Sequence, residues 1–134
     1  MTFRRFEDIQ AWQTARRLAT TVYKVTQNDR FRKDFSLKDQ IRRAAVSAMA
    51  NIAEGLSHRS DKEFARFLVT SKASLNEVQS HAYVALDQSY LDEHDFKDIY
   101  TQAQNGSKQL AGLISHLYGR RKDKPANTPR AACM

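Results

Sequence analysis

The sequence predicts an all-α protein, an up-down-up-down antiparallel four-helix bundle, from three observations. Both prolines, Pro125 and Pro129, lie in the last ten residues, so the preceding residues lack the strongest helix breaker. Apolar residues recur at steps of three and four along four segments, which is the spacing of an amphipathic helix. No run of alternating β-branched residues is long enough for a strand. Short connections between long helices place neighbouring helices antiparallel.

The first two helices are expected in the basic half of the chain. The first extends from about Glu7 to Gln27, and a charged polar linker at residues 28–34 ends it. The second is expected to begin near Ser36, whose hydroxyl could cap its first turn, and to end at Gly55. Its apolar stripe consists of Leu37, Ile41, Ala44, Ala48 and Ile52.

The last two helices have clear start signals. Ser60 with Glu63 has the spacing of a capping box, and the third helix is expected over about residues 61–89. Asp92 or a neighbour is expected to cap the fourth helix, which should end near residue 118.

Residues 1–118 are therefore expected to form the bundle and residues 119–134 a disordered basic tail. That tail contains five cations, one aspartate and both prolines.

Composition favours a cytoplasmic protein. The chain has 134 residues and a single cysteine, Cys133, which excludes an intramolecular disulfide or a cysteine-based zinc cluster and suits a reducing compartment. No apolar run has the length of a signal peptide or a membrane span, so no membrane association is expected.

The charge is unevenly distributed. Residues 1–66 contain fourteen cations and eight anions, a net charge of +6, whereas residues 67–118 contain three cations and six anions, a net charge of −3. Arginine suits phosphate because its planar fork donates two hydrogen bonds together. The candidate nucleic-acid-binding residues are Arg4, Arg5, Arg16, Arg17, Lys24, Lys38, Arg42 and Arg43. The alternative is a solvated basic surface in which Asp39 and Arg43 simply pair across one helical turn.

A polar line along the second helix carries a family resemblance. Its most specific string is Ser47-x-x-x-Asn51-Ile52-Ala53-Glu54-Gly55. Further matches are Gln40 to Ser47, Ser60 with Glu63-Phe64, Phe67-Leu68, and Ser74 to Glu77. With these residues the chain resembles the bacterial four-helix-bundle family of 23S rRNA intervening-sequence proteins, over about residues 6–117.

The resemblance implies a four-helix bundle that assembles into a closed ring of five subunits. A related branch, the accessory proteins of diversity-generating retroelements, associates with a reverse transcriptase and with nucleic acid through a basic surface. For most members no activity is established, and the motif residues Ser47, Asn51, Glu54 and Gly55 are expected to be structural. We expect Asn51 and Glu54 to fasten the second helix to its neighbours and Gly55 to permit the turn.

A wide apolar arc on the first two helices independently suggests self-association. Besides the inward stripes, it comprises Ala11, Leu18, Val25, Val46, Met49, Ala53 and Leu56. One face of a small bundle needs fewer apolar residues than this.

Catalytic and metal-binding patterns are weak. The sequence has no Glu-x-x-His, the pattern that di-metal bundles use, and the pairs Glu54–His58 and Glu77–His81 are interpreted as surface pairs. No serine or cysteine has a nucleophile-elbow setting, and no glycine-rich phosphate loop occurs. We therefore expect no enzyme activity, no metal and no cofactor.

The sequence thus favours a non-enzymatic homo-oligomer, a pentamer by resemblance, that binds RNA or DNA through its basic half. Binding should be sequence-tolerant because no aromatic stacking motif of an RNA-recognition module is present. The alternative is a structural scaffold that binds a protein partner without contacting nucleic acid.

Overall fold

The computed structural model describes residues 3–122, with side chains up to residue 119. Within that range it contains two short 3-10 helices and four α-helices. These are η1 (Phe6–Asp8), α1 (Gln10–Val25), η2 (Phe31–Lys33), α2 (Phe35–Leu56), α3 (Asp61–Asp87) and α4 (Glu93–Lys122). No strand occurs among the described residues, so the predicted all-α class is confirmed.

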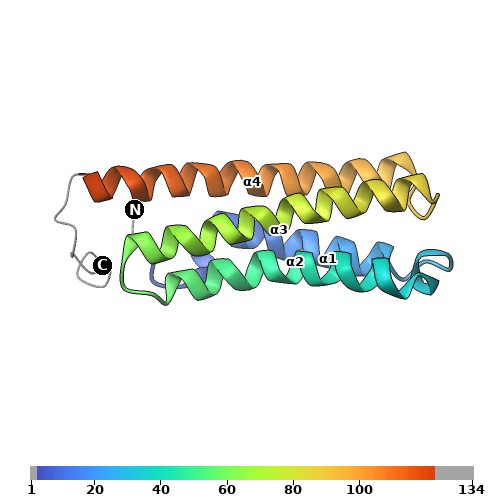
Figure 1. The fold of residues 1–134 in the computed structure, drawn as a ribbon, viewed down its shortest axis with the longest axis horizontal. Helices are drawn as coiled ribbons and strands as arrows, with labels where there is room; N and C mark the ends of the chain where they lie inside the picture. The colour runs from blue at the N-terminus through green and yellow to red at the C-terminus, as the bar shows by residue number, and fades with distance from the viewer. Residues whose placement is uncertain (1–2, 123–134) are drawn as a thin grey trace.

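The four helices lie side by side along one long axis (Figure 1). Helix α1 packs against α2 and α4, and α3 packs against the same two helices, so α1 and α3 lie diagonally opposite each other. Successive helices run in opposite directions because each connection joins two ends at the same side of the bundle (Figure 1). This is the predicted up-down-up-down arrangement.

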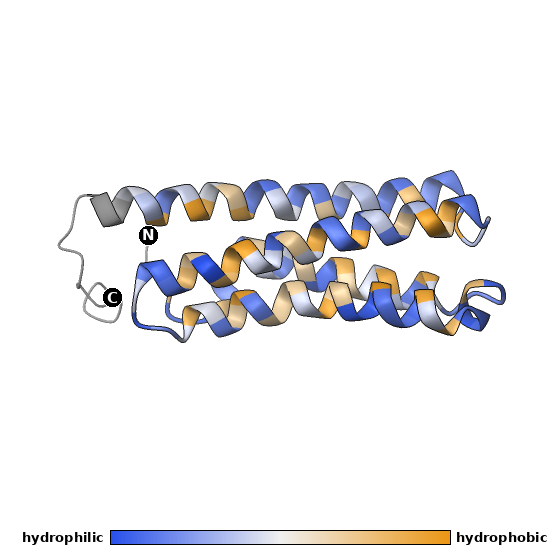
Figure 2. Cartoon of the chain, viewed as in Figure 1, coloured by the Kyte–Doolittle hydropathy of each residue, from blue (hydrophilic) through white to orange (hydrophobic). Residues whose placement is uncertain are grey.

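Apolar side chains from all four α-helices fill the space between them. Each helix alternates hydrophobic and hydrophilic positions along its length (Figure 2), and the hydrophobic ones are largely those removed from water. Side chains that are at most 1 % exposed include Leu18, Ile41, Ile52, Leu68, Leu75, Ile99 and Leu110. Burial of such side chains stabilises the fold by roughly 1.5–3 kcal/mol each.

The predicted cap of α2 is wrong by two residues. Asp34, not Ser36, is the N-cap residue, and its Oδ1 accepts a hydrogen bond from the backbone N–H of Leu37 at 3.1 Å. Ser36 lies inside the first turn, where its hydroxyl accepts from Gln40 instead. A carboxylate just outside the helix also interacts favourably with the partial positive charge of the helix N-terminus.

The segment expected to be a polar linker contains part of the core. Phe31 is fully buried, and its ring centroid lies 5.2 Å from that of Tyr90, which follows α3. The Asn28 side chain accepts from the N–H of Phe31 at 2.8 Å and donates to the carbonyl of Tyr90 at 2.9 Å. Local amide hydrogen bonds therefore turn the chain so that its one apolar residue points inward.

The same end of the bundle is joined by two further contacts. Arg30 donates to the carbonyl oxygens of Gln88 and Ser89, which lie between α3 and α4. The hydroxyl of Tyr90 donates to Asp34 at 3.1 Å, and this hydrogen bond is the main reason that the pKa of Tyr90 is raised. Hydrogen bonds thus join the α1–α2 and α3–α4 connections at this end of the bundle.

The boundaries of α3 and α4 agree with expectation except at their C-terminal ends. The hydroxyl of Ser60 accepts from the N–H of Glu63 at 3.1 Å, and Asp92 accepts from the N–H of Asp95 at 2.7 Å, so both predicted caps are confirmed. Helix α3 ends at Asp87, before Ser89 enters the left-handed region with φ 60°.

Helix α4 was expected to stop at Gly119, but it continues to Lys122. No described glycine has a positive φ, and that conformation is what makes glycine a helix stop. The rest of the predicted tail, residues 123–134, lies outside the described residues.

The apolar arc on the first helix serves the chain's own core. Ala11 and Leu18 are 3 % and 0 % exposed, and Val25 packs against the core, so these residues are not available for self-association. On α2 only Val46 of the predicted arc is largely exposed, at 43 %. No helix in the described part of the chain has a stretch that could cross a lipid bilayer.

Candidate nucleic-acid interface

The eight predicted basic residues fall into three groups in the structure. Arg16, Arg17 and Lys24 lie on the solvent side of α1 and are exposed. Lys38, Arg42 and Arg43 lie in the first turns of α2, and Arg4 and Arg5 precede η1. The structure therefore does not bring all eight together.

The group on α1 is the one with available charge. Neither Arg16, Arg17 nor Lys24 has an ion pair with any described residue. Arg17 donates one hydrogen bond to the hydroxyl of Thr14 at 3.3 Å, which leaves its other donors free. The Arg16 guanidinium lies 5.8 Å from the centroid of the Trp12 ring, within reach of a cation–π interaction.

Two open hollows flank α1 and share Arg16. The hollow towards α4 has a volume of about 580 Å³ and is lined by residues that include Trp12, Arg16, Arg17, Thr20, Thr21 and Gln102. The hollow towards α2, of about 460 Å³, includes Tyr23, Lys24 and Met49. No carboxylate lines either one. The two hollows on the outer side of α1 are therefore lined by cations and neutral side chains.

Arg42 connects the helices. Its Nε donates to the hydroxyl of Thr26 at 2.7 Å, and its guanidinium lies 4.4 Å from the centroid of the Tyr23 ring. Both partners belong to the end of α1, so Arg42 fixes α2 against α1. Its donors are only partly available to a ligand.

Two of the remaining predicted cations, Arg43 and Arg5, are paired with carboxylates of the same chain. Arg43 pairs with Asp39 at 2.6 Å, as the sequence suggested, and the adjacent hollow also contains Lys38 and Glu77. Arg5 pairs with Glu7 at 2.9 Å, and this hydrogen bond lowers the pKa of Glu7 and raises that of Arg5. Arg4 is exposed. The electrostatic contribution of these two groups is therefore weaker than their charge count suggests.

Sequence reasoning missed part of the surface. Trp12 is not among the predicted site residues, although its position one turn before Arg16 is the spacing of side chains that meet on a helix. Gln102 lies on α4 and reaches α1 by donating from Nε2 to Thr21 at 3.1 Å. Nothing in the spacing of the sequence reveals that contact.

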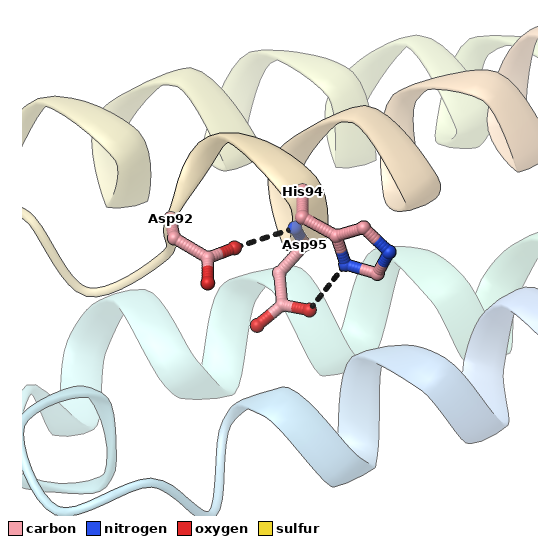
Figure 3. A group of neighbouring side chains, drawn as sticks. All are labelled: Asp92, His94 and Asp95. Carbon is pink, nitrogen blue, oxygen red and sulfur yellow. Dashed lines mark hydrogen bonds and ion pairs between the residues drawn. The ribbon is translucent and has the colours of Figure 1, made fainter.

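One cluster of potential metal ligands occurs at the start of α4 (Figure 3). Asp92, His94 and Asp95 lie together, but Asp92 accepts from the N–H of Asp95, and the Asp95 carboxylate lies 3.4 Å from Nδ1 of His94. Asp92 and His94 are exposed. This arrangement is a capped helix terminus, and it gives no reason to infer a metal.

Comparison with known proteins identifies the family. The sequence profile of the 23S rRNA-intervening sequence proteins matches residues 7–112. The chain belongs to this family. A similar solved structure is that of a protein of unknown function from the S23 ribosomal protein family of Bacteroides thetaiotaomicron. The two chains are 22 % identical with a TM-score of 0.71 over 78 % of this chain and 97 % of the other, which supports the fold. No curated protein matches the sequence.

Ser47, which matches the motif of the 23S rRNA-intervening sequence proteins, joins α2 to α3, and the motif residue Asn51 supports it from within α2. The hydroxyls of Ser47 and Ser74 lie 3.0 Å apart, and the Asn51 side chain donates to both the hydroxyl and the carbonyl of Ser47. A second serine of α3, Ser71, donates to the carbonyl of Ala48 at 2.7 Å. Asn51 therefore contacts only its own helix, where it orients the Ser47 hydroxyl that faces Ser74 on α3.

Gly55 allows α2 to pack closely on α3 just before α2 ends at Leu56, and its φ is not positive. It lies inside α2, and a Cβ atom there would be 2.8 Å from Cβ of Phe67 and 3.0 Å from Cδ1 of Phe64. These atoms belong to the first turns of α3. Glycine is needed because the two helices approach closely at this point.

The predicted role of Glu54 is not observed within the chain. Its side chain is exposed and forms no hydrogen bond or ion pair with another described residue. Its backbone carbonyl accepts from the hydroxyl of Ser57 at 2.6 Å. Glu54 therefore does not fasten α2 to another helix of the same protomer.

Proposed function

We propose that this member of the 23S rRNA-intervening sequence protein family is a homo-oligomeric bundle that binds RNA or DNA through the outer side of α1. The observation that carries the proposal is the surface around Arg16, Arg17 and Lys24, whose two hollows contain no carboxylate. A cation without an intramolecular partner can bind a phosphate without first breaking an ion pair. Its binding releases counterions from the nucleic acid, which favours the complex. Binding of this kind is sequence-tolerant because phosphate contacts do not distinguish bases.

The proposed role is non-enzymatic and cytoplasmic. Three histidines have neighbours typical of structural residues: His58 stacks on Phe67 with ring centroids 4.7 Å apart, His81 lies 3.5 Å from Glu77, and His94 lies beside Asp95. Such pairs need no reacting partner. The lone thiol, Cys133, suits a reducing compartment.

Self-association is supported by apolar residues that the chain leaves exposed. Val46 on α2 and Val69 on α3 are 43 % and 49 % exposed. A homo-oligomer, a ring of five by family resemblance, would cover such side chains and repeat the basic surface on every subunit. Weak phosphate contacts would then add through avidity.

Light scattering measures the assembly directly. We expect a mass near five protomers that falls when Val46 and Val69 are both replaced by glutamate, because each charge would be buried against a second copy. The matched control places glutamate at Thr101 and Ala111, which are exposed on α4, away from Val46 on α2 and Val69 on α3. A compact monomer in the wild-type protein would contradict the proposed assembly.

A protein-interaction scaffold without nucleic-acid binding is the second candidate. The same exposed valines favour it, because a partner of a different sequence could cover them. In that case the basic surface would contribute only to solubility.

Titration against a structured RNA separates the two functions. We expect binding at about 50 mM salt that weakens by about 10³-fold or more at about 200 mM, as phosphate-dominated complexes do. Absence of binding at the lower salt concentration would exclude the first function and leave the scaffold. Fluorescence anisotropy of labelled RNA provides the measurement.

A further inference from the structure

The hollow between α1 and α4 differs from the other basic hollow in containing an indole. Trp12 lies one helical turn before Arg16, and the guanidinium of Arg16 is 5.8 Å from its ring centroid. Phe6 supports the indole on another side, with ring centroids 5.1 Å apart at an interplanar angle of 62°. Two flat groups, one aromatic and one cationic, are thus held together at the edge of an open hollow.

The same hollow has donors for a phosphate. Arg17 lines it with only one neutral hydrogen-bond partner, the Thr14 hydroxyl at 3.3 Å. A phosphate oxygen would be a shorter, charge-assisted acceptor for the remaining donors of its guanidinium. Arg16 therefore places positive charge beside the Trp12 ring, and Arg17 places it elsewhere in the same hollow.

An unsatisfied acceptor lies at the α4 side. Nε2 of Gln102 is 2.9 Å from Oδ1 of Asp98 and 3.1 Å from the hydroxyl of Thr21. Because an ionised carboxylate only accepts hydrogen bonds, the amide nitrogen must face Asp98. Oε1 of Gln102 is therefore left buried without a donor among the described residues. Because this oxygen is buried, a ligand in the open hollow does not reach it, and Gln102 contributes to the lining without accepting from a ligand.

A ligand with a planar ring and an anionic group fits the stacking pair Trp12–Arg16 and the free donors of Arg17. We propose that the hollow between α1 and α4 binds one unpaired nucleotide of single-stranded RNA or DNA, with its base stacked against Trp12 and Arg16 and its phosphate on Arg17. This inference rests on the proposed nucleic-acid binding and adds strand selectivity to it. A base in a duplex is stacked and paired, so only an unpaired base can reach the indole.

Trp12 reports on this hollow alone because it is the only tryptophan in the chain. The full-length protein is titrated with oligo(U) of about 15 nucleotides and with an RNA duplex of similar length, while tryptophan emission and the anisotropy of labelled RNA are both recorded. We expect oligo(U) to quench the emission to saturation. The duplex should raise the anisotropy without quenching.

The two readouts separate the two proposals. Binding seen by anisotropy without quenching by oligo(U) overturns the single-strand inference and leaves nucleic-acid binding intact. No anisotropy change with either RNA overturns both. Equal quenching by oligo-glutamate of the same charge would assign the hollow to an acidic peptide and likewise overturn the inference.

Two variants complete the test. Trp12→Leu should weaken oligo(U) binding by at least about fivefold and leave duplex binding unchanged, since stacking accounts for that factor per base. Because Trp12 packs on Phe6, Arg17→Gln serves as a second variant at an exposed position, and it should raise the oligo(U) concentration needed for half-maximal quenching without altering the fold. The matched control is Lys62→Gln, an exposed cation on α3. A quenching curve for Arg17→Gln with the same half-maximal oligo(U) concentration as the wild type would contradict the proposal.

Discussion

Replacing Phe31 by alanine is expected to lower the free energy of unfolding by about 3–5 kcal/mol. The side chain is fully buried although it lies in a charged connection, and its ring packs against Tyr90 in the opposite connection. Alanine would leave a cavity where the α1–α2 and α3–α4 connections meet. Chemical denaturation followed by circular dichroism, at one fixed protein concentration because assembly contributes to stability, measures the change.

Phe35 provides the matched control four residues later. Its side chain is 73 % exposed, and its ring centroid lies 4.9 Å from Nζ of Lys38. Phe35→Ala should therefore lower the free energy of unfolding by less than about 1 kcal/mol. Equal effects of the two substitutions would show that Phe31 is not part of the core.

Substituting Gly55 by valine is expected to destabilise the protein by about 3 kcal/mol. Its Cβ would meet Cβ of Phe67 at 2.8 Å, and an atom next to the backbone cannot move away without shifting α3. The better helix propensity of valine offsets only a few tenths of a kcal/mol of that cost. Thermal unfolding should therefore begin at a clearly lower temperature.

Gly112 tests whether this effect comes from packing. It also lies inside a helix, but no atom is within 4 Å of a Cβ placed there. Gly112→Val should leave stability unchanged or raise it slightly. If both glycines tolerate valine, the close approach of α2 and α3 at Gly55 is not required.

Residue spacing was sufficient to predict the fold class and most helix starts. The caps at Ser60 and Asp92 could be predicted because each is a local pattern within four residues. Asp34 and Ser36 both precede the apolar stripe, and both residue types cap helices well. Only the backbone geometry distinguishes them.

Features that depend on another helix could not be predicted. The burial of Phe31 depends on Tyr90, and the steric constraint at Gly55 depends on Phe67. Each partner belongs to a different element of the fold. The eight basic residues illustrate the same limit, because a charge count does not show that Arg43 is paired while Arg17 is not. Partners from other elements decide which cations are available.

The central claim is that unpaired cations on α1, and not total charge, bind nucleic acid. The most direct measurement is the salt dependence of RNA affinity in two double variants. One is Arg16→Gln/Arg17→Gln on α1. The other, the control, is Lys62→Gln/Arg66→Gln, which removes two exposed cations from the diagonally opposite helix α3. We predict that the α1 variant binds at least about tenfold more weakly and that its slope of log K against log salt falls by about 2 for each subunit that contacts the RNA, one unit per lost contact. The α3 variant should retain the wild-type slope. Equal losses in the two variants would contradict the account.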